Sequence, residues 1–318
     1  MITFEQMRDV LIPAGRELLL ENMNMTAQRM RERLFWFLPV FGTKQTSDWT
    51  NQISSFFNAR PWPEWDEQQP IPKTKWEDVD RTEVDLSEYM DSFSLTDRYL
   101  TFGDPKQALD YTIPKLADFL ENFVMAGLMQ HTLKAANVFF DAFAGNTFTG
   151  LDGFPLCYHN HTGGFSNLLS LDLDEAALQT AWELRMHITD DNANVLPIMP
   201  DTLLVGPKNK INAFELVSNS VKPGAMNSEK NFWQGAIKNV VECPYFDSAQ
   251  QGAPAYADDM WFLIDSGANT LRYFLNEMPR LLDRVTISPV EMTIVGRTRM
   301  AFGWHSWEGV IGSKGTET

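Results

Sequence analysis

The chain has 318 residues, of which 44% are hydrophobic and 21% charged, and this composition excludes a fibrous repeat and wholesale disorder. Its longest uncharged stretch of helical character, 122–133, is shorter than the roughly 20 residues of a membrane span, and the N-terminus lacks the apolar core of a signal peptide. Two cysteines exclude a disulfide framework and favour a reducing compartment, and a net charge of −16 excludes general attraction to nucleic acid.

The first 47 residues have the pattern of an arm rather than a core. Two stretches, 5–20 and 26–37, have helical character, and the second carries the basic residues Arg29, Arg31 and Arg33. Two interpretations of these arginines stay open: they pair with acidic residues of a neighbouring subunit, or they form a solvated helix face.

The segment 49–103 combines four prolines with many charges and aromatic rings. Residues 48–104 carry five basic and thirteen acidic residues, and the aromatic residues include Trp62, Trp65 and Trp76. A segment so rich in proline and charge cannot form a core by itself, so these rings either fill the protein's own core or dock on neighbouring subunits, the interpretation that we favour. Alternation over 82–86 and 92–95 predicts a long two-stranded hairpin.

The clearest single element is a long helix after residue 104. Asp104-Pro105-Lys106-Gln107 has the pattern of a capping box, and Pro114 either kinks or restarts the helix. Apolar residues then recur at helical spacing up to Gly145-Asn146, which predicts a spine about 45 Å long. His131 lies on the apolar face, where a satisfied core histidine is expected rather than a ligand.

The rest of the chain alternates helices and strands and then becomes almost purely strand. A helix is predicted from Asp172 and Glu175, in capping positions, to Ile188, and 166–268 forms an α/β unit. We expect the late strands to pack against the long helix. The other predicted elements are a helix over 208–217 and strands over 202–206, 238–243, 260–265, 271–275, 285–287, 292–303 and 310–311.

One cluster of residues could bind a metal ion or take part in catalysis. The sequence has neither a phosphate-binding glycine loop nor a serine nucleophile elbow. Cys157, His159 and His161 alternate, but a structural zinc site needs four ligands, so a solvated loop is the favoured interpretation. The competing hypothesis is a metal-dependent hydrolase that uses His159, His161 and a carboxylate such as Asp152.

Taken in order, the elements resemble the major capsid proteins of tailed bacteriophages, which have the Hong Kong 97 fold. The resemblance covers 1–318, rests on the arrangement of the elements and is closest to Mu-like head subunits. The residues that carry it are the arm, the acidic hairpin, the spine helix, the turn Asp152-Gly-Phe-Pro-Leu, the strand Trp261-Phe-Leu-Ile-Asp265, and the closing stretches Arg297–Trp304 and Val310–Lys314.

The resemblance implies an α+β protein with five parts and a structural function. The subunit would assemble as hexamers and pentamers into an icosahedral shell around double-stranded DNA, with no catalysis, cofactor, metal or membrane. An encapsulin-like compartment is the alternative. The implied parts are an N-terminal arm (1–48), an extended loop (49–103), a peripheral domain with the spine helix (104–165) and the closing strands (269–318), and an axial domain (166–268).

The resemblance also implies partners and a location. Copies of the chain itself, a separate scaffolding protein, a portal and decoration proteins are the expected partners, and the subunit would be part of the virion after assembly in the host cytoplasm. Some family members join an extended-loop lysine to an asparagine on the closing strands of a neighbour. Lys73 and Lys75 would supply the amine, but 277–318 contains no asparagine, so we expect a shell without covalent cross-links.

Overall fold

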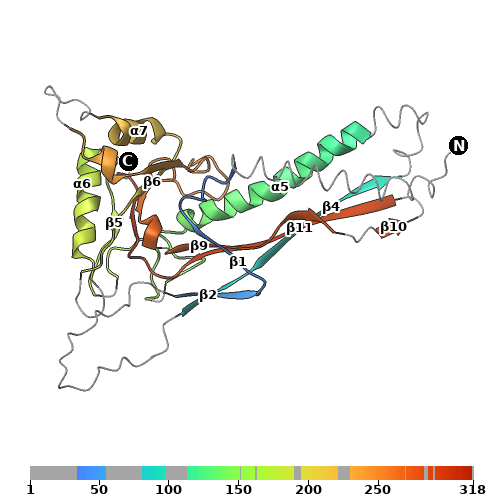
Figure 1. Cartoon of the computed structure of the whole chain (residues 1–318), viewed down its shortest axis with the longest axis horizontal. Helices are drawn as coiled ribbons and strands as arrows, with labels where there is room; N and C mark the ends of the chain where they lie inside the picture. The colour runs from blue at the N-terminus through green and yellow to red at the C-terminus, as the bar shows by residue number, and fades with distance from the viewer. Residues whose placement is uncertain are drawn as a thin grey trace, which may run out of the picture.

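The computed structural model has two five-stranded sheets and a long helix, which runs along one of the sheets (Figure 1). None of the helices in the described part of the chain combines the length and apolar character needed to cross a membrane. The structure describes residues 34–54, 81–96, 113–150, 152–161, 163–189, 195–220, 230–268, 270–282, 286–288 and 291–316.

The first sheet is long and narrow because its central strand, β11 (Glu291–Trp304), has fourteen residues. On one side β11 pairs antiparallel with β9 (Leu271–Leu281) and the short β10 (Thr286–Ser288), and on the other with β4 (Ser87–Thr96). β1 (Gly42–Gln45) adds to β9 in parallel.

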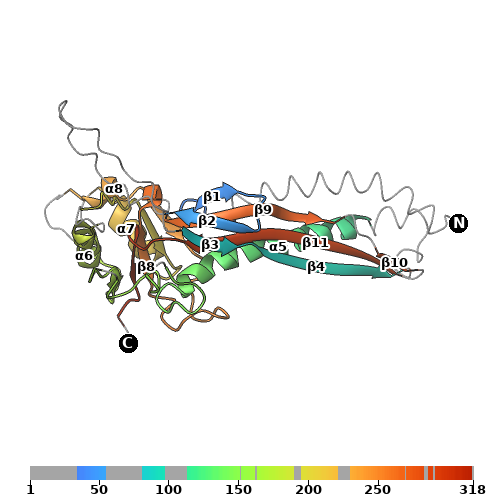
Figure 2. The same ribbon diagram turned by 90° about the horizontal axis from the view of Figure 1, so that it is seen from below.

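The helix α5 (Ile113–Phe140) is the predicted spine, and it packs on this sheet, as expected (Figure 2). Pro114 lies in its first turn, where a missing N–H costs no helical hydrogen bond. Two glycines allow α5 to lie close to the sheet. A Cβ atom on Gly127 would lie 2.9 Å from Pro279, and one on Gly296 would lie 2.3 Å from the ring of Phe123. The predicted start near Asp104 lies outside the described residues.

His131 joins the spine to the sheet, and the prediction of a satisfied core histidine is confirmed. It is fully buried, with Nδ1 2.8 Å from the Tyr273 hydroxyl and Nε2 2.7 Å from Thr298 Oγ1. Thr298 donates its own hydrogen to the Glu277 carbonyl, so it accepts from His131 and fixes the tautomer with hydrogen on Nε2. Burial lowers the pKa of His131 to about 3, which keeps the ring neutral.

The second sheet belongs to the predicted α/β unit and has the order β5-β12-β8-β6-β7. The expected strands and helices over 202–265 are all present, and α6 and α7 pack with the sheet through the apolar residues around Leu178 and Leu216. The strands are β5 (Leu168–Leu169), β6 (Thr202–Val205), β7 (Asn239–Glu242), β8 (Trp261–Ile264) and β12 (Val310–Ser313), and the helices are α6 (Glu175–Leu184), α7 (Lys210–Ser218) and α8 (Trp233–Ala236).

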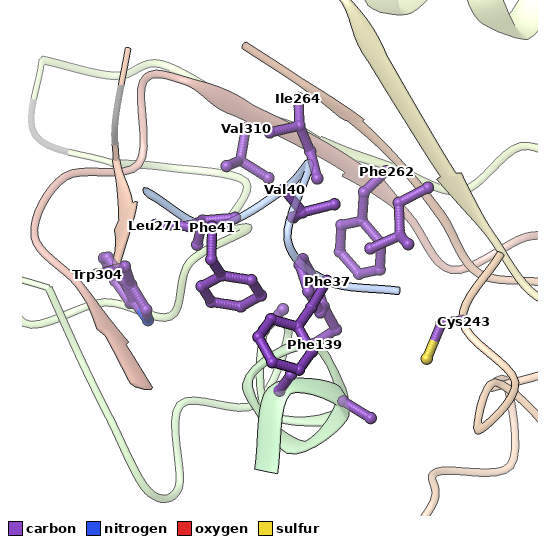
Figure 3. Packing of buried hydrophobic residues seen from close by; sticks show 14 of the residues in the cluster. Phe37, Val40, Phe41, Phe139, Cys243, Phe262, Ile264, Leu271, Trp304 and Val310 are labelled. Atoms are coloured by element: carbon purple, nitrogen blue, oxygen red, sulfur yellow. The ribbon is translucent and has the colours of Figure 1, made fainter. Parts of the chain in front are cut away.

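The end of the expected arm belongs to the core of the subunit. Phe35 is buried in the cluster that the spine and both sheets share. Phe37, Val40 and Phe41 belong to the same cluster (Figure 3). The Phe41 ring lies 5.7 Å from the Phe139 ring of α5. In the sequence, an aromatic run beside basic residues is compatible with an arm or with a core segment. In the structure this run belongs to the core, because its apolar rings are buried. The preceding residues, 1–33, lie outside the described part.

Three further expectations need correction. Asp174, not Asp172, caps α6, because its carboxylate accepts the Ala177 N–H at 2.6 Å. The strands predicted over 82–86 and 92–95 do not pair with each other: β3 (Arg81–Asp85) forms a hairpin with β2 (Thr50–Ser54), and β4 joins β11. The last strand, β12, pairs with β8 and so belongs to the sheet of the α/β unit rather than with the other closing strands.

Candidate functional site

The expectation of a solvated loop around Cys157, His159 and His161 is wrong for two of these three residues, which are buried. Cys157 is fully buried, and burial raises the pKa of its thiol. His161 is also buried, and its two ring nitrogens contact Asp152 and Asn167. His159 instead lies at the surface, with its ring tilted against the ring of Tyr158. The described residues contain no group of three side chains able to hold a metal ion.

Asp152 and His161 do meet, as the hydrolase hypothesis required, but their contacts are internal. The Asp152 carboxylate lies 2.5 Å from His161 Nδ1, and Asn167 Oδ1 lies 3.0 Å from Nε2. The imidazole also stacks on Trp307 with ring centres 4.2 Å apart. Neither ring nitrogen has a free lone pair directed at solvent. This histidine could therefore bind a metal ion only if its hydrogen bonds to Asp152 and Asn167 were broken.

Exposed apolar side chains gather on the α/β unit. The larger exposed hydrophobic residues of the described chain are ten, and seven of them lie between residues 166 and 268. The seven are Leu171, Met186, Val195, Met199, Ile211, Phe214 and Phe232. Such a concentration on one part of a subunit is typical of a surface that another protein covers.

Helix α7 presents one of these surfaces because it has apolar residues on two opposite faces. Ala213, Leu216 and Val217 face the core, whereas Ile211 and Phe214 are 73% and 61% exposed. A spacing of three residues places the two exposed side chains next to each other on one face of the helix. We call Ile211 and Phe214 the α7 face.

Phe232 packs against two tryptophan rings although it is 60% exposed. Its ring lies 5.6 Å from that of Trp182 and 5.2 Å from that of Trp233. The adjacent Asn231 donates to the carbonyls of Leu216 and Asn219, which ties this segment to the end of α7. The Phe232 ring is therefore positioned before any partner binds, and preorganisation of this kind lowers the entropic cost of association.

Two lysines near the α7 face are already paired within the subunit. Lys210 forms an ion pair with Glu242, and Lys208 lies 2.5 Å from Asp259. This arrangement, with an apolar centre and a polar rim, is the usual anatomy of a protein interface.

A groove of about 370 Å³ lies between α5 and the first sheet. Phe123, Val124 and Pro279 contribute apolar lining, and Arg280 and Arg297 lie at its border. Both guanidinium groups already pair with Glu277, Arg297 through Nε at 2.8 Å. They are therefore not available as a site for a free anion, and the groove suits an apolar side chain better than a charged small molecule.

The contact residues predicted from sequence lie outside the described residues, so the structure does not test them. They are Arg29, Arg31, Arg33, Trp62, Trp65 and Trp76. Sequence reasoning missed the α7 face, although a signal was present: on a helix over 208–217, Ile211 and Phe214 fall opposite Ala213, Leu216 and Val217.

Comparison with known proteins gives the family and the fold. The family model described as "Phage capsid protein" matches residues 82–312. A structure of the capsid of Myoviridae phage XM1 has a TM-score of 0.50 and 8% identity, covering 88% of this chain and 90% of that one. No curated protein sequence matches the chain.

Two further solved structures are similar over most of their length. The capsid of an empty GTA particle has a TM-score of 0.49 and 14% identity, with 87% of this chain and 88% of that one covered. A virus-like particle from Pyrococcus furiosus has a TM-score of 0.45 and 9% identity, with 93% and 98% covered. With a family match that includes β3, β4, the spine and most of both sheets, the chain belongs to the phage capsid protein family and has the Hong Kong 97 fold.

Proposed function

We propose that this chain is the major capsid subunit that assembles as hexamers and pentamers into the icosahedral head of a tailed phage around double-stranded DNA. The observation that carries the proposal is the family match over residues 82–312, which includes the spine helix and the central strands of both sheets. The acidic character agrees with this function, because a net charge of −16 limits attachment of packaged DNA through its phosphates.

The proposed function is structural and not catalytic. The residues that a hydrolase would need, His161 and Asp152, contact each other and support the loop in which they lie. The expected partners remain other copies of the chain, a scaffolding protein, a portal and decoration proteins, with assembly in the host cytoplasm.

The division into parts is proposed with the corrections that the strand pairing requires. The extended loop includes the β2–β3 hairpin, and the peripheral part consists of α5 with β4, β9 and β11. The axial part consists of the α/β unit together with β12. The arm would include the residues before Phe35, since Phe35 itself is buried in the core.

Three surfaces are proposed to join copies in the shell. They are the α7 face, the arginines Arg29, Arg31 and Arg33, and the tryptophans Trp62, Trp65 and Trp76. The α7 face is supported by its two exposed apolar side chains on one side of the helix. The other two sets are supported by their composition alone, because aromatic and arginine side chains are enriched in interfaces.

Assembly of purified protein tests the proposal. Concentrated wild-type protein should form closed particles in negative-stain micrographs. The double variant Ile211→Asp with Phe214→Asp should remain a cooperatively melting subunit, since it places charge in an apolar contact. Thr180→Asp, which adds a charge at an exposed position of α6, is the matched control and should assemble. Closed particles from the double variant would exclude the α7 face, and failure of the wild type to associate would contradict the function itself.

A second variant tests the extended loop. We expect replacement of Arg60–Arg81 by a short Gly/Ser linker to leave a soluble subunit that forms no closed particles. Unfolding of this variant, or normal particles, would contradict an intersubunit function for the loop. The denatured wild-type shell should show a single subunit band in reducing SDS, because a covalent ladder would contradict non-covalent assembly.

A further inference from the structure

Two chain connections meet beside β12, and a buried polar cluster joins them. One connection runs from the end of α5 to β5, and the other, 305–309, links β11 to β12. The first contributes Asp152, His161 and Asn167, and the second contributes Trp307 and Glu308. We call these five residues the junction cluster.

Asn167 is the fixed centre of the junction cluster. Its amide nitrogen donates to the carbonyls of Leu156 at 2.8 Å and Val310 at 2.9 Å. Its amide oxygen accepts the N–H of Tyr158 at 2.8 Å. Two carbonyl acceptors on the nitrogen define the orientation of the amide, so the oxygen can only accept from its remaining neighbour, His161.

The hydrogen bonds of Asn167 determine how many protons the histidine pair holds. Because Asn167 Oδ1 accepts, His161 Nε2 carries a hydrogen. Nδ1 lies 2.5 Å from Asp152 Oδ2, a distance that requires a second hydrogen between these two atoms. Whether that hydrogen belongs to the imidazole or to the carboxyl group, the pair has no net charge.

Glu308 places a second carboxyl group next to this neutral pair. Its Oε2 atom is buried, and no hydrogen-bond partner for it exists among the described residues. The groups that face the carboxyl are the Glu308 N–H, Ser306, His161 and Asp152. The pKa of Glu308 is raised, first by burial and to a smaller extent by the Asp152 charge, and the two hydrogen bonds and His161 oppose the rise.

We propose that the junction cluster is a proton-dependent latch, which holds the Asp152–Asn167 loop firmly to the β11–β12 connection at acidic pH and loosens as the pH rises. With Glu308 protonated, the cluster has no net charge and its hydrogen bonds are undisturbed. With Glu308 ionised, the cluster gains one buried negative charge, and the hydrogen bonds from its own N–H and Ser306 and the attraction of His161 do not fully offset the loss of water. The latch is connected to both sheets, because Trp307 and Glu308 lie in the short connection from β11 of the first sheet to β12 of the second.

The sign of the pH effect follows from the direction of the shift. Glu308 has a higher pKa in the folded chain than in the unfolded chain, so its contribution to stability is complete below the ordinary value of 4.5. The contribution decreases as the pH rises from that value through the pKa of the folded chain. Asp172 and Asp258 have lowered pKa values and titrate below this window.

Unfolding of the dilute full-length chain between pH 5 and 8 tests the latch. The Glu308→Gln variant keeps the shape of the side chain but cannot ionise. The ratio of the unfolding constants of wild type and variant should increase with pH by up to about tenfold per pH unit until Glu308 is ionised in the folded chain. Glu215→Gln, an exposed change on α7, should follow the wild type at every pH. A pH-independent ratio for Glu308→Gln would overturn the proposal.

Hydrogen exchange provides a local measurement that needs no variant. The amides of Tyr158 and Gly312 both donate to Asn167, from opposite sides of the junction. After correction for intrinsic exchange, both should be less protected at pH 8 than at pH 5, and in Glu308→Gln the difference should be absent. Equal protection at the two pH values in the wild type would overturn the latch even if the variant did not fold.

Discussion

Replacement of His131 by leucine tests how the spine is fastened to the sheet. The change removes the acceptor of the Tyr273 hydroxyl and the donor to Thr298, both inside a fully buried region. Loss of two buried hydrogen bonds, with similar side-chain volume, should lower the free energy of unfolding by about 3 kcal/mol at pH 7.

The cost of His131→Leu should disappear in acid. Burial lowers the pKa of His131 from 6.5 to about 3, so the neutral ring is required for folding and the unfolded chain takes up a proton first. Wild-type stability from this residue is therefore complete above pH 6.5 and decreases as the pH falls, by about 1.4 kcal/mol per unit. Two pH units offset about 3 kcal/mol, so the two proteins should be equally stable near pH 4.5.

Urea titrations of both proteins at pH 7.0, 6.0, 5.0 and 4.5, followed by tryptophan fluorescence, measure this difference. Other titrating groups, Glu308 included, are common to the two proteins and cancel. A difference in unfolding free energy that is constant from pH 7 to 4.5 would refute the buried neutral histidine. A difference near zero at pH 7 would refute the two hydrogen bonds as a source of stability.

Three further changes have defined expectations. Asn167→Ala removes all four side-chain hydrogen bonds of a buried residue and should cost more than about 3 kcal/mol in denaturant titrations. Gly296→Ala places a methyl group against the ring of Phe123 and should cost about 1–3 kcal/mol in the same assay, whereas Gly235→Ala, which meets open space, should cost nothing. Asp174→Ala removes the N-cap of α6 and should lower the unfolding free energy by about 1 kcal/mol, with an unchanged denaturant slope.

Local patterns predicted most elements, because helix and strand periodicity are properties of short segments. The expected strand over 202–206 and the expected helix over 208–217 correspond to β6 and α7, and His131 has the expected buried environment. Strand pairing was less predictable. The partners of β12 are β5 and β8, which are distant in sequence, and no short pattern encodes which strands meet.

At the candidate site, too, local patterns were predictable and contacts between distant segments were not. The number and spacing of Cys157, His159 and His161 led to the expectation of a solvated loop, whereas Cys157 and His161 are buried, because burial and the hydrogen bond between Asp152 and His161 depend on how the loop folds. The α7 face was missed, although it could have been predicted as a second apolar stripe on the helix expected over 208–217. Asp172 and Asp174 are both plausible caps in sequence, and only the path of the chain decides between them: Asp172 binds Thr316 instead.

The position of β12 has a consequence for how the subunit is made. β12 lies between β5 and β8, so the second sheet is divided until this strand arrives. From the end of β8 at Ile264 to the start of β12 at Val310 the ribosome must add about 46 residues, which takes roughly 2 to 9 s at typical synthesis rates. During that time β8 exposes an unpaired edge, and the helices of the α/β unit rest on an incomplete sheet. A nascent chain therefore lacks a complete second sheet with which to contact another subunit. The order of synthesis itself delays association until each subunit is nearly finished.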